Sequence, residues 1–353
     1  MFAKILTIVL LILPLTMCGY FWDKPDRSNG DQGGETAGGS GGENPCQHSR
    51  PLELRRAIYD TKGDEIDDAQ AASELVNWQA LSVKSADHKK FNFAVLFGTC
   101  SGSFIKQVNV KDTSPAYILT NGHCVASPLL PSTGVFYDLP PGIRKATFNY
   151  YLDATVAERK VFAAKTIVFA SMEATDVGLV ALATTYADVI KAGFVAIPMA
   201  SARPTEAQTP MHLVGMPQSH LKTAQLGLRL STCCTDRLAV NLHEGDYRFS
   251  DSISYRGCSI VGGNSGSPMV DLKKWEVFAV VNTGVNDPAS PNECIIDHPC
   301  EVSADSKVAT HGDRNYGQHV SFLTLCFNAD GIFDRNAPGC GIAQKFPQAA
   351  TLL

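Results

Sequence analysis

One serine of this chain, Ser265, lies inside a run of small, flexible residues, GGNSGSPM at 262–269. A serine hydroxyl is a poor nucleophile at neutral pH unless a base within hydrogen-bond reach takes its proton. The base works best when a buried carboxylate fixes its tautomer. Taken alone, Gly-Asn-Ser-Gly is ordinary turn chemistry. Ser265 therefore indicates catalysis only if a histidine and an acidic residue elsewhere in the chain can join it.

His123 is the strongest candidate for the base among the nine histidines. It follows the strand-like run AYILTNG at 116–122 and precedes Cys124. A histidine at the end of a strand, beside a bridged cysteine, would be held rigidly, which a general base requires. A lone histidine in such a place is more often structural or exposed, so this assignment also depends on its partners.

Asp176 is the candidate for the carboxylate, because it leads the apolar run of ATDVGLVAL at 174–182. An aspartate there could also be a turn or cap residue, and Asp153 and Asp188 are rival carboxylates. The three candidates together are much harder to explain by coincidence than each one alone.

Short strands must position these three residues. From about Arg55 onward, runs rich in Val, Ile, Phe and Thr alternate with Gly, Pro, Asn and Asp, a pattern typical of strands and turns. Their number and spacing predict an all-β fold of the sandwich or barrel kind, with few short helices. Helical stretches are expected at 67–81 and near 186–191. The strand-like runs lie at 91–98, 116–122, 146–152, 165–170, 177–182, 211–217 and 275–284.

Several segments resemble, in order, those of the chymotrypsin-like serine peptidases. The resemblance covers roughly residues 57–326, and the order His, Asp, Ser is the one this fold uses. It implies two packed, antiparallel, six-stranded β-barrels with the site in the cleft between them. We expect the first barrel at 51–190, with the histidine and the aspartate, and the second at 191–353, with the serine and a C-terminal extension. The segments are FGTCSGSFI (97–105) with LTNGHCV (119–125), ATDVGLVAL (174–182), GGNSGSPM (262–269), FAVVNTG (278–284) and NYGQHVSFLTLC (315–326).

The resemblance implies a role for each candidate residue. His123 would act as general base and then acid, Asp176 would orient it, and Ser265 would form an acyl-enzyme. The backbone N–H groups of Gly263 and Ser265 would bind the oxyanion, since two amides aimed at one point need a tight turn, which glycine permits. No metal or cofactor is implied. The rate should rise with pH through a histidine pKa of about 6 to 7.

The primary specificity pocket would be lined from two segments. The residues before the nucleophile contribute Ser259 and Ile260, and the strand beside the substrate contributes Asn282, Thr283 and Gly284. No carboxylate stands there to pair with a substrate Lys or Arg. In glutamyl endopeptidases a histidine and a Thr or Ser bind the substrate carboxylate, and here Asn282 and Ile260 take those places. We therefore expect cleavage after a neutral side chain, with the substrate backbone added to that strand.

The nucleophile loop resembles the bacterial branch of this family that includes the glutamyl endopeptidases. RRAIYDTKGDE at 55–65 is similar to the start of mature domains in that branch, which makes processing after Arg56 a hypothesis. Many animal members have Asp before the nucleophile, where this chain has Asn264. A neutral amide cannot form an ion pair with a new N-terminal amine, so we expect no activation switch of that kind.

The N-terminus is typical of an export signal. MFAKILTIVLLILPLTMC has one lysine, Lys4, before an apolar run of 11 residues, too short to span a bilayer comfortably. Its end at 15–18 resembles a bacterial lipobox. We therefore expect a signal peptide at 1–17, a lipid on Cys18 and a flexible Gly/Ser-rich linker at 18–50; an ordinary cleaved signal is the alternative. The protein is thus expected in the bacterial cell envelope or secreted.

Eleven cysteines in an exported chain indicate disulfides, and a lipid on Cys18 leaves an even number. The resemblance implies a bridge between Cys100 and Cys124. The adjacent Cys233 and Cys234 cannot readily bridge each other, so each should have a distant partner.

A metal site competes with disulfides as the interpretation of Cys294, His298, Cys300 and His311. The spacing is not that of a C-x-x-C pair and the expected compartment is oxidising, so disulfides are favoured. Plausible pairs are Cys258 with Cys294 or Cys300 and Cys326 with Cys340, and Cys46 could attach the linker to the folded part.

Composition and the resemblance together predict the function. The formal charge of -5, with no long run of one sign, gives no nucleic-acid footprint. We expect a secreted or membrane-tethered serine endopeptidase that acts on protein or peptide substrates, with a membrane contact through the lipid on Cys18. The alternatives are a catalytically silent surface-binding protein with a trypsin-like fold and a serine esterase. The G-x-S-x-G elbow of most such esterases is missing, because Ser267 stands where its last Gly would be.

Overall fold

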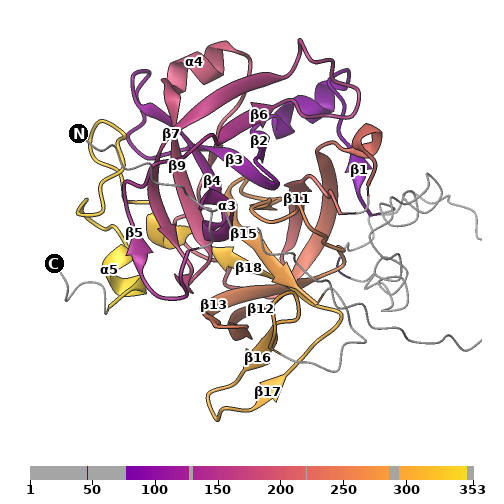
Figure 1. Cartoon of the computed structure of the whole chain (residues 1–353), viewed down its shortest axis with the longest axis vertical. Coiled ribbons are helices and arrows are strands. Elements are labelled where there is room, and N and C mark those ends of the chain that lie inside the picture. Colours follow the sequence, from indigo (N-terminus) through magenta and orange to yellow (C-terminus); the bar gives the residue numbers. More distant parts are fainter. Residues whose placement is uncertain (1–45, 47–76, 127–129, 220, 286–293, 348–353) are drawn as a thin grey trace, which may run out of the picture. The chain divides into compact units, whose positions relative to one another are not determined.

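The computed structural model describes residue 46 and residues 77–126, 130–219, 221–285 and 294–347 (Figure 1). The expected signal peptide at 1–17, the lipidation site Cys18 and the processing site Arg56 lie outside the described residues, as does the expected linker except for Cys46. Within the described part of the chain, no helix is long and apolar enough to cross a membrane.

Six strands form a closed antiparallel ring, called here the first ring. Their order is β3-β2-β6-β7-β9-β4, and β4 pairs again with β3. The strands are β2 (Ala94–Phe97), β3 (Cys100–Lys106), β4 (Pro115–Thr120), β6 (Lys145–Phe148), β7 (Lys160–Ser171) and β9 (Val177–Thr185).

Six later strands form a second antiparallel ring. Their order is β12-β11-β14-β15-β18-β13, and β13 pairs again with β12. The predicted all-β fold of two antiparallel six-stranded barrels with few short helices is confirmed. The strands are β11 (Pro210–Gly215), β12 (Arg229–Glu244), β13 (Tyr247–Arg256), β14 (Pro268–Asp271), β15 (Val277–Gly284) and β18 (Asn315–His319).

Short strands tie the two rings together. β1 (Gln79–Ala80) pairs with β12, β8 (Glu173–Ala174) lies parallel to β13, and β10 (Ile197–Pro198) lies parallel to β3. Each ring therefore includes a segment from the part of the chain that builds the other. The other named elements of the described residues are β5 (Val135–Phe136), β16 (Cys300–Val302), β17 (Val308–Ala309), α3 (Gly122–Val125), α4 (Tyr186–Lys191), α5 (Ile342–Lys345) and the 3-10 turns at Ala86–Phe91, Thr223–Gln225 and Ser321–Leu323.

The apolar run of β9 is buried on both of its faces. Leu179 and Ala181 belong to one core cluster, whereas Val180 and Leu182 belong to another. Successive side chains of a strand point to opposite faces, so an unbroken apolar run fills two cores at once. The first cluster also contains residues of the second ring, such as Val280, so one face of β9 belongs to a core that both rings share.

The segment after β18 covers the first ring. The ring centroid of Phe322 lies 5.7 Å from that of Phe169, and Phe327 lies 5.4 Å from Tyr117. Phe346 of the last turn also packs on Phe169, at 6.1 Å. This C-terminal cover explains why β4, β9 and the second half of β7 have so few exposed positions.

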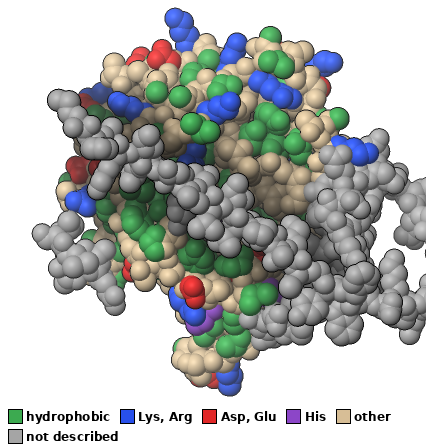
Figure 2. All heavy atoms as spheres, in the orientation of Figure 1, with side chains coloured by type: hydrophobic (Ala, Val, Ile, Leu, Met, Phe, Trp, Pro, Cys, Tyr) green, Lys and Arg blue, Asp and Glu red, His purple; other side chains and the backbone are tan. Residues whose placement is uncertain are grey.

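The first half of β7 is solvated, in contrast to its second half. Val161, Ala163 and Lys165 are exposed, and the strand is buried from Ile167 onward. Figure 1 places β7 and α4 in the upper part of the view. Figure 2, in the same orientation, shows Lys and Arg side chains spread over that part of the visible face. Alternating exposed and inward residues are typical of a strand with one solvated face.

All seven predicted strand runs contain a strand of the structure, and the helix predicted near 186–191 is α4. The helix predicted at 67–81 is wrong where the structure describes it. Gln79–Ala80 form β1 against β12, and the neighbouring Trp78 and Leu81 are buried. Pairing with a long strand and burial of two large apolar side chains outweigh helix propensity here.

Five disulfides join the described cysteines: Cys46–Cys234, Cys100–Cys124, Cys233–Cys258, Cys294–Cys300 and Cys326–Cys340. The pairing of Cys326 with Cys340 was predicted, as was a distant partner for each of the two adjacent cysteines. So many bridges point to an oxidising compartment outside the cytoplasm.

The predicted pairing of Cys258 with Cys294 or Cys300 is wrong. Cys258 follows β13, which pairs with β12 at the position of Cys234, and this brings it to Cys233 instead. Cys233 and Cys234 are successive strand residues and point to opposite faces, so each needs its own partner. Cys294 and Cys300 bridge each other and are not thiolate ligands for a metal.

Candidate active site

His123 lies on α3, the single helical turn that follows β4. Asn121 precedes this turn with extended backbone, and its Nδ2 donates to the backbone oxygen of Asp176 at 2.7 Å. Gly122 has no room for a side chain, because a Cβ there would lie 2.1 Å from the backbone oxygen of Ser171. The turn is therefore tightly packed, while the side chain of His123 keeps 27% of its surface exposed.

His123 and Asp176 form a two-point contact. Nδ1 of His123 lies 2.6 Å from Oδ2 of Asp176, and the backbone N–H of His123 donates to Oδ1 at 3.0 Å. The side chain of Asp176 is fully buried. An ionised carboxylate only accepts hydrogen bonds, so Nδ1 carries the proton and Nε2 is left free to accept one.

Burial and charge act in opposite directions on the pKa of His123. Burial lowers this pKa, whereas the charge of Asp176 and its hydrogen bond raise it, with further raising contributions from Glu244 and Asp297. The net shift is upward. The site thus favours the protonated imidazole that would exist after proton transfer.

The rival carboxylates are engaged elsewhere. Asp153 accepts hydrogen bonds from Ser82 Oγ at 2.5 Å and from the backbone of Val83 at 3.0 Å. Asp188 caps α4 through Thr185. Among the described carboxylates, the one hydrogen-bonded to His123 is that of Asp176.

The loop that holds Ser265 is a tight turn fixed by the first ring. Gly263 has a φ of 99°, and a Cβ there would lie 2.4 Å from a backbone oxygen, so only glycine fits. Ser101, near the start of β3, donates from Oγ to the oxygen of Gly263 at 2.8 Å and from its N–H to the oxygen of Ser265 at 2.8 Å. Ser265 itself remains partly exposed.

The backbone N–H groups of Gly263 and Ser265 donate to no acceptor among the described residues. Between them, Asn264 is buried and tied within the loop, since its N–H donates to the oxygen of Val261 at 3.0 Å and its Oδ1 accepts from the N–H of Val261 at 3.1 Å. Two unpaired N–H groups on a rigid turn are the donors that an oxyanion site needs.

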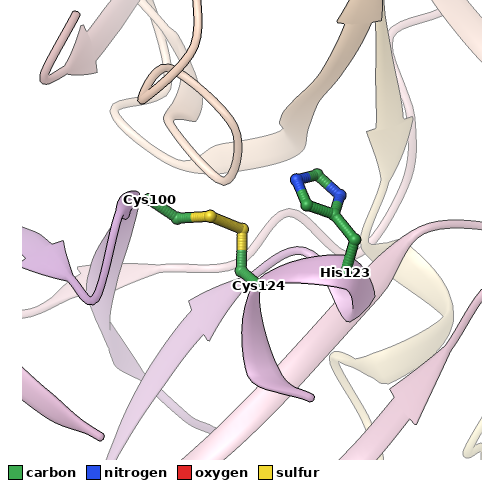
Figure 3. A group of neighbouring side chains, drawn as sticks. All are labelled: Cys100, His123 and Cys124. Carbon is green, nitrogen blue, oxygen red and sulfur yellow. A yellow bond between two sulfur atoms is a disulfide. The ribbon is translucent and has the colours of Figure 1, made fainter. Parts of the chain in front are cut away.

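The disulfide Cys100–Cys124 connects β3, which holds the loop of Ser265 through Ser101, to the turn that carries His123 (Figure 3). Cys124 follows His123, and Cys100 precedes Ser101, which binds the loop. Among the hydrogen bonds of the described residues, none joins Oγ of Ser265 to Nε2 of His123. Such a bond often tightens only when substrate binds.

Cys100, His123 and Cys124 also have the composition of a metal site. Their sulfur atoms and a ring nitrogen lie within 4.8 Å of one another. Figure 3 shows the two sulfurs joined as a disulfide, and a metal ligand would have to be a thiolate. We assign no metal to this group.

The segments predicted to line the specificity pocket meet in the structure. A Cβ on Gly284 would lie 3.2 Å from Cδ1 of Ile260, so the end of β15 touches the segment before the nucleophile loop. The backbone oxygen of Ser259 accepts from Nε1 of Trp78 at 2.8 Å, and Asn282 is buried. The two predicted pocket segments therefore lie against each other at Ile260 and Gly284.

Sequence reasoning missed Glu244, the buried last residue of β12. Its Oε1 accepts hydrogen bonds from Oγ1 of Thr283 at 2.6 Å and from the backbone of Asp297 at 2.9 Å. Burial raises the pKa of Glu244 to about 7; the two hydrogen bonds lower it, and the charges of Asp297 and Asp176 raise it. An acid at the end of a strand is common in solvated hairpins, so no signal in the sequence marked it.

A second missed residue is Asn315, the first residue of β18, which pairs with Gly284 of β15. It stands at the start of the closing segment NYGQHVSFLTLC, whose pattern indicated a strand but no particular side chain.

Two antiparallel six-stranded rings, with a His–Asp contact beside a glycine turn, define the double-barrel class of trypsin-like folds. Residues 100–280, more than half of the chain, match the model of the trypsin-like peptidase domain. The chain belongs to this family, whose members are generally serine hydrolases. No curated protein matches the chain significantly in sequence.

Solved structures resemble the chain at low identity. The MamO protease domain from Magnetospirillum magneticum, in its apo form, is 12% identical, with 66% of this chain and 94% of that chain covered and a TM-score of 0.41. Human heparin binding protein is 13% identical, with 66% and 88% covered and a TM-score of 0.43. The Rv3671c protease from M. tuberculosis, in its active form, is 17% identical, with 63% and 68% covered and a TM-score of 0.37.

Proposed function

We propose that this protein is an exported serine endopeptidase that cleaves peptide bonds through an acyl-enzyme. The observation that carries the proposal is the two-point contact in which the buried carboxylate of Asp176 binds both Nδ1 and the backbone N–H of His123. Membership of the trypsin-like peptidase family supports it. So do the N–H groups of Gly263 and Ser265, for which the described residues provide no acceptor.

In the proposed mechanism, Oγ of Ser265 attacks the carbonyl carbon of the scissile bond while Nε2 of His123 takes the hydroxyl proton. Asp176 stabilises the resulting imidazolium. The carbonyl oxygen becomes an oxyanion that accepts hydrogen bonds from the N–H groups of Gly263 and Ser265. His123 then gives its proton to the leaving amine, the C–N bond breaks, and a water deprotonated by His123 hydrolyses the acyl-enzyme.

We propose that the substrate binds as an added strand along residues 282–284, with a neutral residue before the scissile bond. Ser259, Ile260 and Asn282 offer no charge to a substrate side chain. A charged substrate side chain that lost its water there would gain no charged partner from these three residues, at a cost of roughly several kcal/mol.

We propose further that the protein acts outside the cytoplasm, held in a bacterial cell envelope by a lipid on Cys18 or secreted. The five disulfides support the compartment. The lipid is supported by the lipobox-like sequence at 15–18 alone. Metabolic labelling with an alkyne fatty acid tests it: label on the wild-type chain that disappears in Cys18→Ser is expected, and equal label on both would refute the anchor.

A fluorophosphonate probe tests the peptidase proposal, because it reacts with a serine only when a neighbouring base activates it. The full exported chain should be labelled, and Ser265→Ala should abolish the label. Ser267→Ala is the matched control: it lies in the same loop, is buried, and its hydroxyl has no hydrogen-bond partner among the described residues. This control should keep the label.

The outcomes separate the alternatives. Labelling at Ser265 with cleavage of peptide amides supports the endopeptidase, whereas labelling with cleavage of esters alone indicates an esterase. Folded protein that is not labelled indicates a silent, surface-binding member of the fold. Label that survives Ser265→Ala would refute the assignment of the nucleophile.

A further inference from the structure

Asn315 occupies the space between the two segments proposed to form the specificity pocket. It is 1% exposed and pairs with Gly284 across β18 and β15. Its Nδ2 donates to the backbone oxygen of Cys258 at 2.6 Å. The side chain of Asn315 thus lies between Gly284, at the end of β15, and Cys258, which precedes the other pocket segment.

Gly284 shows how little room is left. A Cβ there would lie 2.3 Å from Oδ1 of Asn315 and 3.2 Å from Cδ1 of Ile260. The amide of Asn315 and the side chain of Ile260 therefore both press on the α-carbon of Gly284. A substrate side chain directed at Gly284 would therefore meet the amide of Asn315 and the side chain of Ile260.

The amide of Asn315 is held in place and does not yield easily to a large substrate. Moving it would break its hydrogen bond and leave the oxygen of Cys258 without that donor, which is unfavourable for a buried group. Asn315 itself is 1% exposed, and because protein interiors are closely packed its side chain has little room to move aside.

We propose that Asn315 is a specificity-determining residue that closes the depth of this pocket, so that the peptidase cleaves after small uncharged side chains such as alanine and serine. The proposal rests on the proposed function and narrows its neutral specificity to small residues. Leucine and phenylalanine need the volume that Asn315 and Ile260 fill. Ile260, Gly284 and Asn315 themselves offer no opposite charge to lysine, arginine or glutamate.

A peptide series that varies only in the residue before the scissile bond tests this proposal, with Ala, Ser, Leu and Phe compared on the full chain. In the wild type, kcat/KM for Ala should exceed that for Phe by about 100-fold. The Phe side chain has several more carbon atoms than the pocket would accommodate, and such a difference in size suffices for this discrimination. Asn315→Gly should reduce this ratio by at least about 10-fold, mainly because kcat/KM for Phe rises.

The matched control is Asn92→Ala. Asn92 is likewise a buried amide with two hydrogen bonds to backbone, one to Gly193 at 2.9 Å and one from Val195 at 2.8 Å, but it belongs to the first-ring side of the molecule. It should lose stability without changing the Ala/Phe ratio. The ratio does not depend on the fraction of folded protein, so it separates specificity from folding.

Two failures are distinguishable. Wild-type protein that cleaves after Phe as well as after Ala, or an unchanged ratio in Asn315→Gly, overturns the role of Asn315 and leaves the peptidase intact. Absence of both peptide cleavage and fluorophosphonate labelling overturns the peptidase and this proposal together. If Asn315→Gly does not fold, Ile260→Ala opens the same space from the other side, and a lowered ratio supports the proposal while an unchanged one refutes it.

Discussion

Replacing Asp176 with asparagine would change which nitrogen of His123 carries a proton. At present Oδ1 accepts from the backbone N–H of His123 at 3.0 Å, and Oδ2 faces Nδ1 at 2.6 Å. A backbone N–H can only donate, so the asparagine must keep its oxygen at the first position and turn its NH2 group toward Nδ1. Nδ1 must then accept a hydrogen bond, the proton moves to Nε2, and the base has no lone pair for Ser265.

The expected loss of catalytic rate is large, because Asp176→Asn keeps both hydrogen bonds to His123 but leaves Nε2 unable to accept the serine proton. A base fixed in the wrong tautomer costs about 10^4-fold in kcat, which corresponds to about 5 kcal/mol of activation free energy. The pKa of His123 should also fall. Burial, which lowers this pKa, remains, whereas the charge of Asp176, which raises it, is gone. The imidazole should therefore titrate below its ordinary value of about 6.5.

Both effects can be measured on the purified chain. Single-turnover acylation with a peptide ester gives the rate of the chemical step across the neutral pH range, and nitrogen NMR of labelled imidazole reports the tautomer and the pKa of His123. Asp188→Asn is the control, since that carboxylate caps α4 and should leave the rate within about twofold. The reasoning is refuted if Asp176→Asn retains more than a tenth of the rate, or if Asp188→Asn loses as much.

Three further predictions follow from the charges and the cross-links. Only neutral His123 can take the serine proton and its pKa is raised, so the pH–rate profile should rise to a midpoint above about 6.5. Asp297→Asn removes one charge that raises this pKa and should move the midpoint down; an unmoved midpoint would contradict this. Burial lowers the pKa of His319 to about 4. Between about 6.5 and 4 the unfolded chain thus binds more protons at His319 than the folded one, and the contribution of His319 to the unfolding free energy should fall by about 3 kcal/mol as the pH drops through this range; urea titrations should show a weaker fall for His319→Leu. Replacing both Cys100 and Cys124 with alanine should cost about 3 kcal/mol of stability and also slow acylation; a loss of stability with an unchanged rate would mean that the bridge does not help to position His123.

Much of the fold was predictable from the residues alone. Runs such as VGLVAL at 177–182 combine β-branched residues with burial on both faces, and they became strands such as β9. The segment at 67–81 was not predictable in the same way. Its described end forms β1 because β12, more than a hundred residues later, offers an edge at Arg229 and Leu230. Local propensity carries no information about such a distant partner.

The candidate site was predictable in its chemistry but not in its surroundings. The motifs around His123 and Asp176 are short and local, and the structure brings the two side chains together; their catalytic role stays a prediction, as does that of Ser265. Glu244 and Asn315 stand at strand ends in ordinary sequence and acquire their positions from β15, which passes beside both. The pairing of Cys258 failed for the same reason, since it depends on the register of β12 and β13.

The disulfide between Cys46 and Cys234 joins positions 188 residues apart. A cut at Arg56 would turn one polypeptide into two without releasing either of them. With a lipid on Cys18, the processed enzyme would stay at its membrane for as long as that bridge is oxidised. Release would then be controlled by a thiol reductant and not by a second protease, and the intact and nicked forms would run apart on a gel only after reduction.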